Sequence, residues 1–210
     1  GTVAWTYAIA ESAVDFLAVG ESVQLVYTIT VDDGNGGADT QDVTITVTGA
    51  NDHPTISSTN FTRTVVEDEA SPYLTATRTI TFDDVDLTDT HSVTVTKLTG
   101  TVGGTLTAAV TDVATGAGNG TVRWDYEVAN ANTQYLARNE TTTETFDVTI
   151  SDGEGGAVSR TVTITIRGTN DAPVIQIADV DGSVTDVAEN EQSAAQDAAL
   201  LATTGSFTFT

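Results

Sequence analysis

The chain has 210 residues, 30 of them acidic and 7 basic, which gives a formal net charge of −23 and a pI near 4.1. A field of this sign repels phosphate, so nucleic acids and anionic membranes are excluded as partners and cations are favoured. Cysteine is absent, which excludes disulfides and thiolate zinc sites. No apolar stretch is long enough for insertion into a membrane.

The chain repeats itself with a shift of 119 residues. Gly1–Trp5 (GTVAW) returns as Gly120–Trp124 (GTVRW), Asn51–Pro54 (NDHP) returns as Asn170–Pro173 (NDAP), and about 23 of 54 positions are identical in this register. A fixed period without slippage indicates an array of one module. It predicts the C-terminal half of a module at 1–54, one complete module at 55–173, and the N-terminal part of the next at 174–210.

Segments that alternate apolar residues with threonine follow one another along the chain. This period of two is typical of strands that are buried on one face. The clearest segments are Tyr27–Val31, Val43–Val47, Val93–Val95, Phe146–Ile150 and Val162–Ile166. Glycine-rich sequences, DDGNGGAD and SDGEGGAV, join the first pair and the last pair, and both are typical of hairpin turns. The sequence therefore predicts an all-β fold of two-sheet sandwiches.

A Trp-x-Tyr pair occurs in both copies, as Trp5 with Tyr7 and as Trp124 with Tyr126. Residues two apart on a strand point to the same face, so both rings are expected to fill the core of a small sandwich. An aromatic platform for sugars is the alternative.

The acidic residues are grouped at the ends of predicted strands and in turns. In the complete module the groups are Glu67–Glu69, Asp83 to Asp86 with Asp89, Glu140, Asp152, and Asn170–Asp171. Two carboxylates about 4 Å apart repel by roughly 4 kcal/mol at an effective dielectric near 20, so a cation between them is favoured. Oxygen ligands without Cys or His indicate Ca²⁺ rather than zinc. The alternative is a solvated acidic surface that keeps a secreted array soluble.

The order of these motifs resembles a known family. The half-module that runs from GTVAW through LAVGES to VDDGNGG and TGANDHP resembles the VCBS repeat of large bacterial surface adhesins of the RTX type, and it is similar, more loosely, to the calcium linkers of cadherins. The resemblance implies tandem Ig-like or cadherin-like β-sandwich modules joined by short acidic linkers. It also implies a calcium-stiffened spacer in an extracellular or cell-surface bacterial adhesin, exported by type I secretion, that acts in cell adhesion or biofilm formation.

The cadherin likeness also implies a set of ligands at each junction between modules. At the first junction it implies Glu21, Asn51, Asp52, Asp84, Asp86 and Asp152. At the second it implies Glu67 or Glu69, with Glu140, Asn170 and Asp171. Asp33 stands in the DDGNGG turn, where a turn role and a ligand role are both open. The loops LAVGE and LARNE keep one carboxylate of the acidic pair that cadherins have, which implies fewer or weaker ions.

Two other functions stay open. One is a filament subunit whose half-modules are completed by strand addition between chains, and another is a glycan-binding module that uses the tryptophans. An enzyme is not expected, because no nucleophile, base or phosphate-binding loop has the required sequence context. The expected partners are neighbouring modules in the same or an adjacent chain.

Overall fold

The computed structural model describes residues 1–67, 71–114, 119–173, 175–178 and 207–209. The chain forms two compact units, Gly1–Thr169 and Asn170–Thr210. The described residues form strands and two short 3₁₀ turns: η1 (Glu11–Ala13), β1 (Ser22–Asp32), β2 (Ala38–Thr48), β3 (Thr55–Ile56), β4 (Thr62–Val66), β5 (Tyr73–Asp83), β6 (Ser92–Thr99), β7 (Thr105–Asp112), β8 (Gly120–Ala129), η2 (Asn130–Asn132), β9 (Thr141–Ser151), β10 (Ala157–Arg167), β11 (Ile175–Ala178) and β12 (Phe207–Phe209). The predicted all-β class is confirmed.

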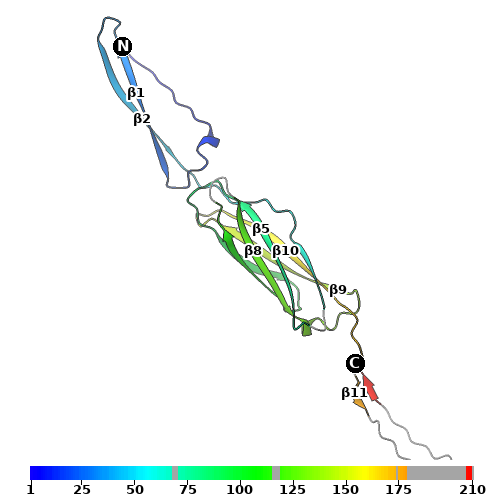
Figure 1. Cartoon of the computed structure of the whole chain (residues 1–210). Coiled ribbons are helices and arrows are strands. Elements are labelled where there is room, and N and C mark those ends of the chain that lie inside the picture. Colours follow the sequence, from blue (N-terminus) through cyan, green and yellow to red (C-terminus); the bar gives the residue numbers. More distant parts are fainter. Residues whose placement is uncertain (68–70, 115–118, 174, 179–206, 210) are drawn as a thin grey trace, which may run out of the picture. The chain divides into compact units, whose positions relative to one another are not determined.

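Strands β3 to β10 make a sandwich of two four-stranded sheets (Figure 1). One sheet has the strand order β3-β5-β8-β7 and the other has the order β4-β10-β9-β6. The first two strands of the sandwich belong to different sheets: β3 pairs antiparallel with β5 in one sheet, and β4 pairs parallel with β10 in the other. This is the strand order of an Ig-type sandwich with a divided first strand.

The core lies between the two sheets and follows the predicted alternation. On β9, Phe146, Val148 and Ile150 are buried, and the residues between them are only partly covered. Trp124 and Tyr126 are buried on β8, where the Tyr126 ring meets the Phe146 ring edge-on with centroids 5.9 Å apart. The packing role predicted for this pair is confirmed, and burial prevents Trp124 from serving as a sugar platform.

The first half-module repeats the local structure of residues 120–167 but not its burial. Strands β1 and β2 have the bounds of β9 and β10 shifted by 119 residues. Gly1–Ala10, however, is not a strand, although its counterpart β8 pairs with both β5 and β7. Residues 1–54 contain no counterparts of β5 and β7, so Trp5 is 53% exposed while Trp124 is 0% exposed. The prediction that Trp5 fills a core is therefore wrong for this half-module.

The strand pair β11–β12 of the second unit resembles the first strand pair of the sandwich, β3–β5. Ile175 on β11 lies opposite Phe209 on β12, as Ile56 on β3 lies opposite Phe82 on β5. Ile175 follows Ile56 by the repeat length of 119 residues. The module boundaries at residues 54 and 173 stay predictions.

Candidate metal centre

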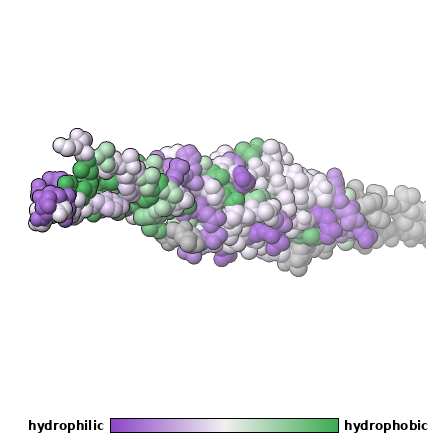
Figure 2. All heavy atoms as spheres, turned by 90° about the horizontal axis from the view of Figure 1, so that it is seen from above, coloured by the Kyte–Doolittle hydropathy of each residue, from purple (hydrophilic) through white to green (hydrophobic). Residues whose placement is uncertain are grey.

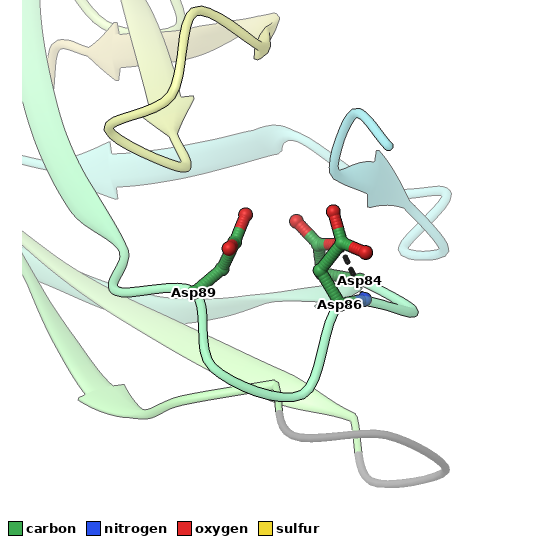
Figure 3. A group of neighbouring side chains, drawn as sticks. All are labelled: Asp84, Asp86 and Asp89. Carbon is green, nitrogen blue, oxygen red and sulfur yellow. Dashed lines mark hydrogen bonds between the residues drawn. The ribbon is translucent and has the colours of Figure 1, made fainter. Parts of the chain in front are cut away.

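Three aspartates project from the loop between β5 and β6 toward the same region (Figure 3). They are Asp84, Asp86 and Asp89, and each offers a carboxylate oxygen within 4.8 Å of the others. Asp86 is 0% exposed and Asp89 is 8% exposed. At an effective dielectric near 20, charges about 4.8 Å apart repel by roughly 3 kcal/mol per pair, so burying three of them together is costly without a cation.

Backbone amides hold two of these carboxylates in place. The Asp86 amide donates to Asp84 Oδ1 over 3.2 Å, which turns the loop back on itself. The Asp52 amide, from the segment between β2 and β3, donates to Asp86 Oδ2 over 2.8 Å. The cluster is thus already joined to the segment that connects the half-module to the sandwich.

A fourth buried carboxylate comes from the hairpin turn between β9 and β10. Asp152 Oδ1 accepts from the amides of Glu154 (2.8 Å) and Gly156 (2.9 Å), an arrangement that closes the turn. A side chain at position 156 would overlap Asp152 Oδ2, so a larger residue there would displace this carboxylate. Asp152 Oδ2 accepts from Asn51 Nδ2 over 3.0 Å. An ionised carboxylate cannot donate, so the Asn51 amide must turn its NH₂ to Asp152 and keep its oxygen free.

Three buried oxygens in this region have no hydrogen-bond partner among the described residues. They are Asn51 Oδ1, Asp86 Oδ1 and Asp89 Oδ2. Buried polar atoms are nearly always paired, so each unpaired atom requires a physical explanation. Carboxylate and amide oxygens in this combination are the ligands that Ca²⁺ takes, and neither sulfur nor imidazole is in the group. The residues therefore fit a hard divalent cation.

The pKa values of the aspartates reflect how each is buried. Burial raises the pKa of Asp86, and the charges of Asp52, Asp84 and Asp152 raise it further, against the effect of the Asp52 amide. Burial, with the charges of Asp86, Asp84 and Asp152, raises the pKa of Asp89 to about 6. Burial is also the largest effect on Asp152, but hydrogen bonds from Asn51, Glu154 and Gly156 together outweigh it and lower the pKa. The site thus takes up protons readily at Asp86 and Asp89.

We expect the stability of the sandwich in a calcium chelator to fall as pH rises from about 4 to about 6. Folding raises the pKa of Asp89 from 3.8 to about 6, so the folded state binds this proton more tightly than the unfolded state does. That preference is lost once the carboxyl ionises, at a cost of roughly 2 kcal/mol. The lowered pKa values of Asp33, Asp125 and Asp152 act in the opposite direction, chiefly below about pH 5, so they offset the trend only at the acid end of this range.

Urea unfolding across this pH range measures the effect. Saturating calcium should reverse the trend, because protons compete with the metal for the same oxygens. Stability in chelator that rises between pH 4 and 6 would contradict the raised pKa of Asp89.

Four of the six residues predicted for the first junction lie together, and the other two do not contribute a carboxylate to the cluster. Asn51, Asp84, Asp86 and Asp152 are brought together, as described above. Asp52 is exposed, and its amide rather than its carboxylate makes the hydrogen bond to Asp86. Glu21 is half-buried and its Oε2 accepts from the Ala18 amide over 3.1 Å, within its own loop. Its role as a ligand stays a prediction.

The residues predicted for the second junction are held mainly by their own surroundings. Glu67 is buried: its Oε1 accepts from Thr133 Oγ1 (3.2 Å) and Gln134 Nε2 (2.8 Å), and its Oε2 accepts from the Thr169 amide (2.9 Å). Glu140 repeats the loop of Glu21, accepting from the Ala137 amide over 2.9 Å.

The remaining predicted ligands lie elsewhere. Asn170 and Asp171 are exposed residues of the second unit. Glu69 lies outside the described residues. Asp33 repeats the turn geometry of Asp152, since its Oδ1 accepts from the amides of Asn35 (2.8 Å) and Gly37 (3.0 Å), and these bonds lower its pKa. Asp33 is exposed, and the turn role is shown while the ligand role stays a prediction.

Two residues of the centre were missed as site residues by sequence reasoning. Asp89 stands in the same acidic group as Asp84 and Asp86, but the cadherin pattern takes only a D-x-D pair from this loop. His91 is a single histidine that belongs to no metal-binding or catalytic motif of the sequence. Its Nε2 lies 3.0 Å from Asp84 Oδ2, with both side chains fully buried. The spacing D-x-D-x-x-D-x-H between two strands was the signal that could have found both.

No protein-family model matches the chain, and no curated protein matches it. Among solved structures it is similar to CfaE, the adhesive subunit of CFA/I fimbria of enterotoxigenic Escherichia coli (TM-score 0.42, 9% identity, covering 73% of this chain and 59% of that chain). It is also similar to mouse clustered PcdhgC3 EC1-3 (0.40, 15%, covering 77% and 48%) and to zebrafish RET cadherin-like domains 1 to 4 (0.34, 15%, covering 71% and 34%). The chain spans less than two thirds of each of these proteins. Every TM-score is below 0.5, so the sandwich assignment here rests on strand order.

Proposed function

We propose that this chain is part of a calcium-stiffened spacer in an extracellular adhesin, in which Ca²⁺ binds where one module follows another. The observation that supports the proposal is the cluster of Asp84, Asp86 and Asp89, which each offer a carboxylate oxygen within 4.8 Å of the others. Asp86 Oδ1 and Asp89 Oδ2 in this cluster, and Asn51 Oδ1 beside Asp152, are buried and have no hydrogen-bond partner among the described residues. The role is mechanical rather than catalytic. The VCBS-type and RTX-type assignment, the bacterial cell-surface location and a part in biofilm formation belong to the same proposal, on the resemblance given above.

The position of the site explains how an ion would stiffen the chain. Asp84, Asp86 and Asp89 belong to the sandwich, whereas Asn51 lies at the C-terminal end of the half-module, between β2 and β3. One ion bound to both parts would fix the direction in which the chain enters the sandwich. Among the described residues, hydrogen bonds already join the two parts: Asn51 Nδ2 to Asp152 Oδ2 (3.0 Å), the Asp52 amide to Asp86 Oδ2 (2.8 Å) and the Leu87 amide to Phe16 O (3.3 Å).

The stabilisation by calcium can be estimated from mass action. An extracellular site of this kind has a dissociation constant of about 0.1 to 1 mM. Free calcium at about a hundred times that constant adds roughly 2.7 kcal/mol to the bound state. This is of the same order as the net contribution of the existing hydrogen bonds, so the ion would add substantially to the stiffness of the joint.

Small-angle scattering of the full chain, with and without calcium, tests the proposal. We expect the maximum dimension of the chain to rise on addition of calcium and the range of distances between its parts to narrow. Both changes should reverse when chelator is added. Asp86→Asn should show no response, while Asp83→Asn, which changes the neighbouring acid outside the cluster, should respond as the unmodified chain does. Identical profiles of the unmodified chain in calcium and in chelator would refute calcium stiffening.

A second candidate function is assembly by strand addition, and the exposed face of the half-module favours it. Val3, Trp5, Ile9, Tyr27 and Val31 are large hydrophobic residues with about half of their surface exposed. Figure 2 shows green, hydrophobic patches on the surface behind the hydrophilic tip at the end opposite the grey atoms. The matching positions in the sandwich are covered by β5 and β7 and by the opposing sheet. Such faces are typical of sites that accept added strands.

Sedimentation velocity over a wide range of chain concentration tests this second candidate. Strand addition predicts a sedimentation coefficient that rises with concentration and falls back when Trp5 and Tyr27 are replaced by serine. A single monomeric species at every concentration would exclude assembly by the chain alone.

A further inference from the structure

We propose that His91 is a positioning residue of the metal centre, which aims the Asp84 carboxylate by donating a hydrogen bond to it. This inference rests on the proposed function, because it assigns a role at the same site. His91 contributes no ligand atom to the cluster of Asp84, Asp86 and Asp89. It acts on the metal through Asp84 alone.

The contact has the geometry of a fixed support. His91 Nε2 lies 3.0 Å from Asp84 Oδ2, and the exposed fraction of both side chains is 0%. Asp84 Oδ1 accepts from the Asp86 amide over 3.2 Å. Both oxygens of Asp84 therefore have donors, whereas Asp86 and Asp89 each keep one oxygen without a partner. Donors on both oxygens fix the plane of the Asp84 carboxylate before any cation arrives.

The direction of the hydrogen bond follows from chemistry. An ionised aspartate only accepts, so Nε2 must carry the hydrogen. Nδ1 is buried and has no partner among the described residues, so a hydrogen on that nitrogen would be unsatisfied. The tautomer with hydrogen on Nε2 is thus the one that the surroundings select.

The ring itself is held by packing. Its centroid lies 4.8 Å from that of Phe82, at an interplanar angle of 55°. Phe82 is fully buried on β5, and His91 directly precedes β6. The rigid sandwich therefore supports His91, His91 supports Asp84, and Asp84 faces the cation. Groups that orient a ligand in this way typically change metal affinity by about 10- to 100-fold when they are removed.

Calcium titration calorimetry on the full chain tests the inference with two variants. His91→Phe keeps a ring against Phe82 but loses the donor, while His91→Gln keeps an N–H donor. We expect the dissociation constant for calcium to rise by about 10- to 100-fold in His91→Phe and by only a few-fold in His91→Gln. A purely structural role would instead lower the unfolding midpoint in chelator equally in both variants and leave calcium affinity unchanged in the folded protein.

Affinity in a folded His91→Phe equal to that of the unmodified chain would overturn the inference, as would equal losses in both variants. Nitrogen NMR of the unmodified chain gives an independent answer if His91→Phe does not fold. The expected spectrum shows a slowly exchanging hydrogen on Nε2 and none on Nδ1, and the opposite tautomer would overturn the inference. If the unmodified chain itself bound no calcium, the proposed function would fail, which is a separate and distinguishable result.

Discussion

Replacing Asp86 by asparagine should raise the dissociation constant for calcium at least 100-fold and, in chelator, should make the sandwich more stable. Asp86 is fully buried and has one oxygen without a partner, so it is expected to contribute a full charge to the ion. Losing that charge removes about 3 kcal/mol of binding energy, which corresponds to a factor of roughly 100. The new amide can still accept from the Asp52 amide, and its NH₂ can donate to a neighbouring carboxylate.

The sign change with calcium is the informative part of this prediction. Without the ion, Asp86→Asn relieves repulsion of roughly 3 kcal/mol per neighbouring charge. With the ion, the same change removes a ligand. Urea unfolding in calcium and in chelator measures both, with Asp83→Asn as the matched control. An Asp86→Asn variant that is destabilised equally in both solutions would show that Asp86 has only a structural role.

Trp124→Ala should lower the free energy of unfolding by about 3 to 5 kcal/mol, whereas Trp5→Ala should lower it by less than about 1 kcal/mol. The two residues occupy the same place in the repeat, but only Trp124 is enclosed by both sheets. Truncating it leaves a cavity in the core, while truncating Trp5 removes a ring that already faces solvent. The difference between the two variants therefore measures how much the covering strands contribute to the free energy of unfolding at this position of the repeat.

Urea unfolding at low chain concentration, where assembly is excluded, gives both values. Tyr135→Ala is a suitable control, because Tyr135 is also an exposed aromatic residue, on the loop before β9. A cost for Trp5→Ala close to that for Trp124→Ala would mean that the half-module face is covered in solution.

The strands could be predicted from the sequence because their physical cause is local. Alternation of apolar residues with threonine, broken by glycine-rich turns, located β1, β2, β6, β9 and β10, although the predicted segments are shorter than the strands and begin up to five residues late. The exposure of Trp5 could not be predicted in this way. A period of two residues shows which rings share a face of a strand. Burial of that face, however, depends on covering strands that residues 1–54 do not contain.

The centre was predicted in part for a similar reason. Asp84, Asp86, Asp152 and Asn51 come from three separate segments that the resemblance could order, and the structure brings them together. Asp89 and His91 depend on the path of one irregular loop, which no periodic pattern describes. Glu67 is the opposite case: the resemblance implied that it binds a metal, but both of its carboxylate oxygens accept hydrogen bonds from its own module.

A crystal structure of the full chain grown in about 10 mM calcium is the most direct test of the central claim. The account predicts a cation with oxygen ligands at about 2.3 to 2.6 Å, among them Asp86 Oδ1, Asp89 Oδ2 and Asn51 Oδ1. A map in which these three oxygens bind only water at that concentration would contradict the account and leave only the sandwich fold in place.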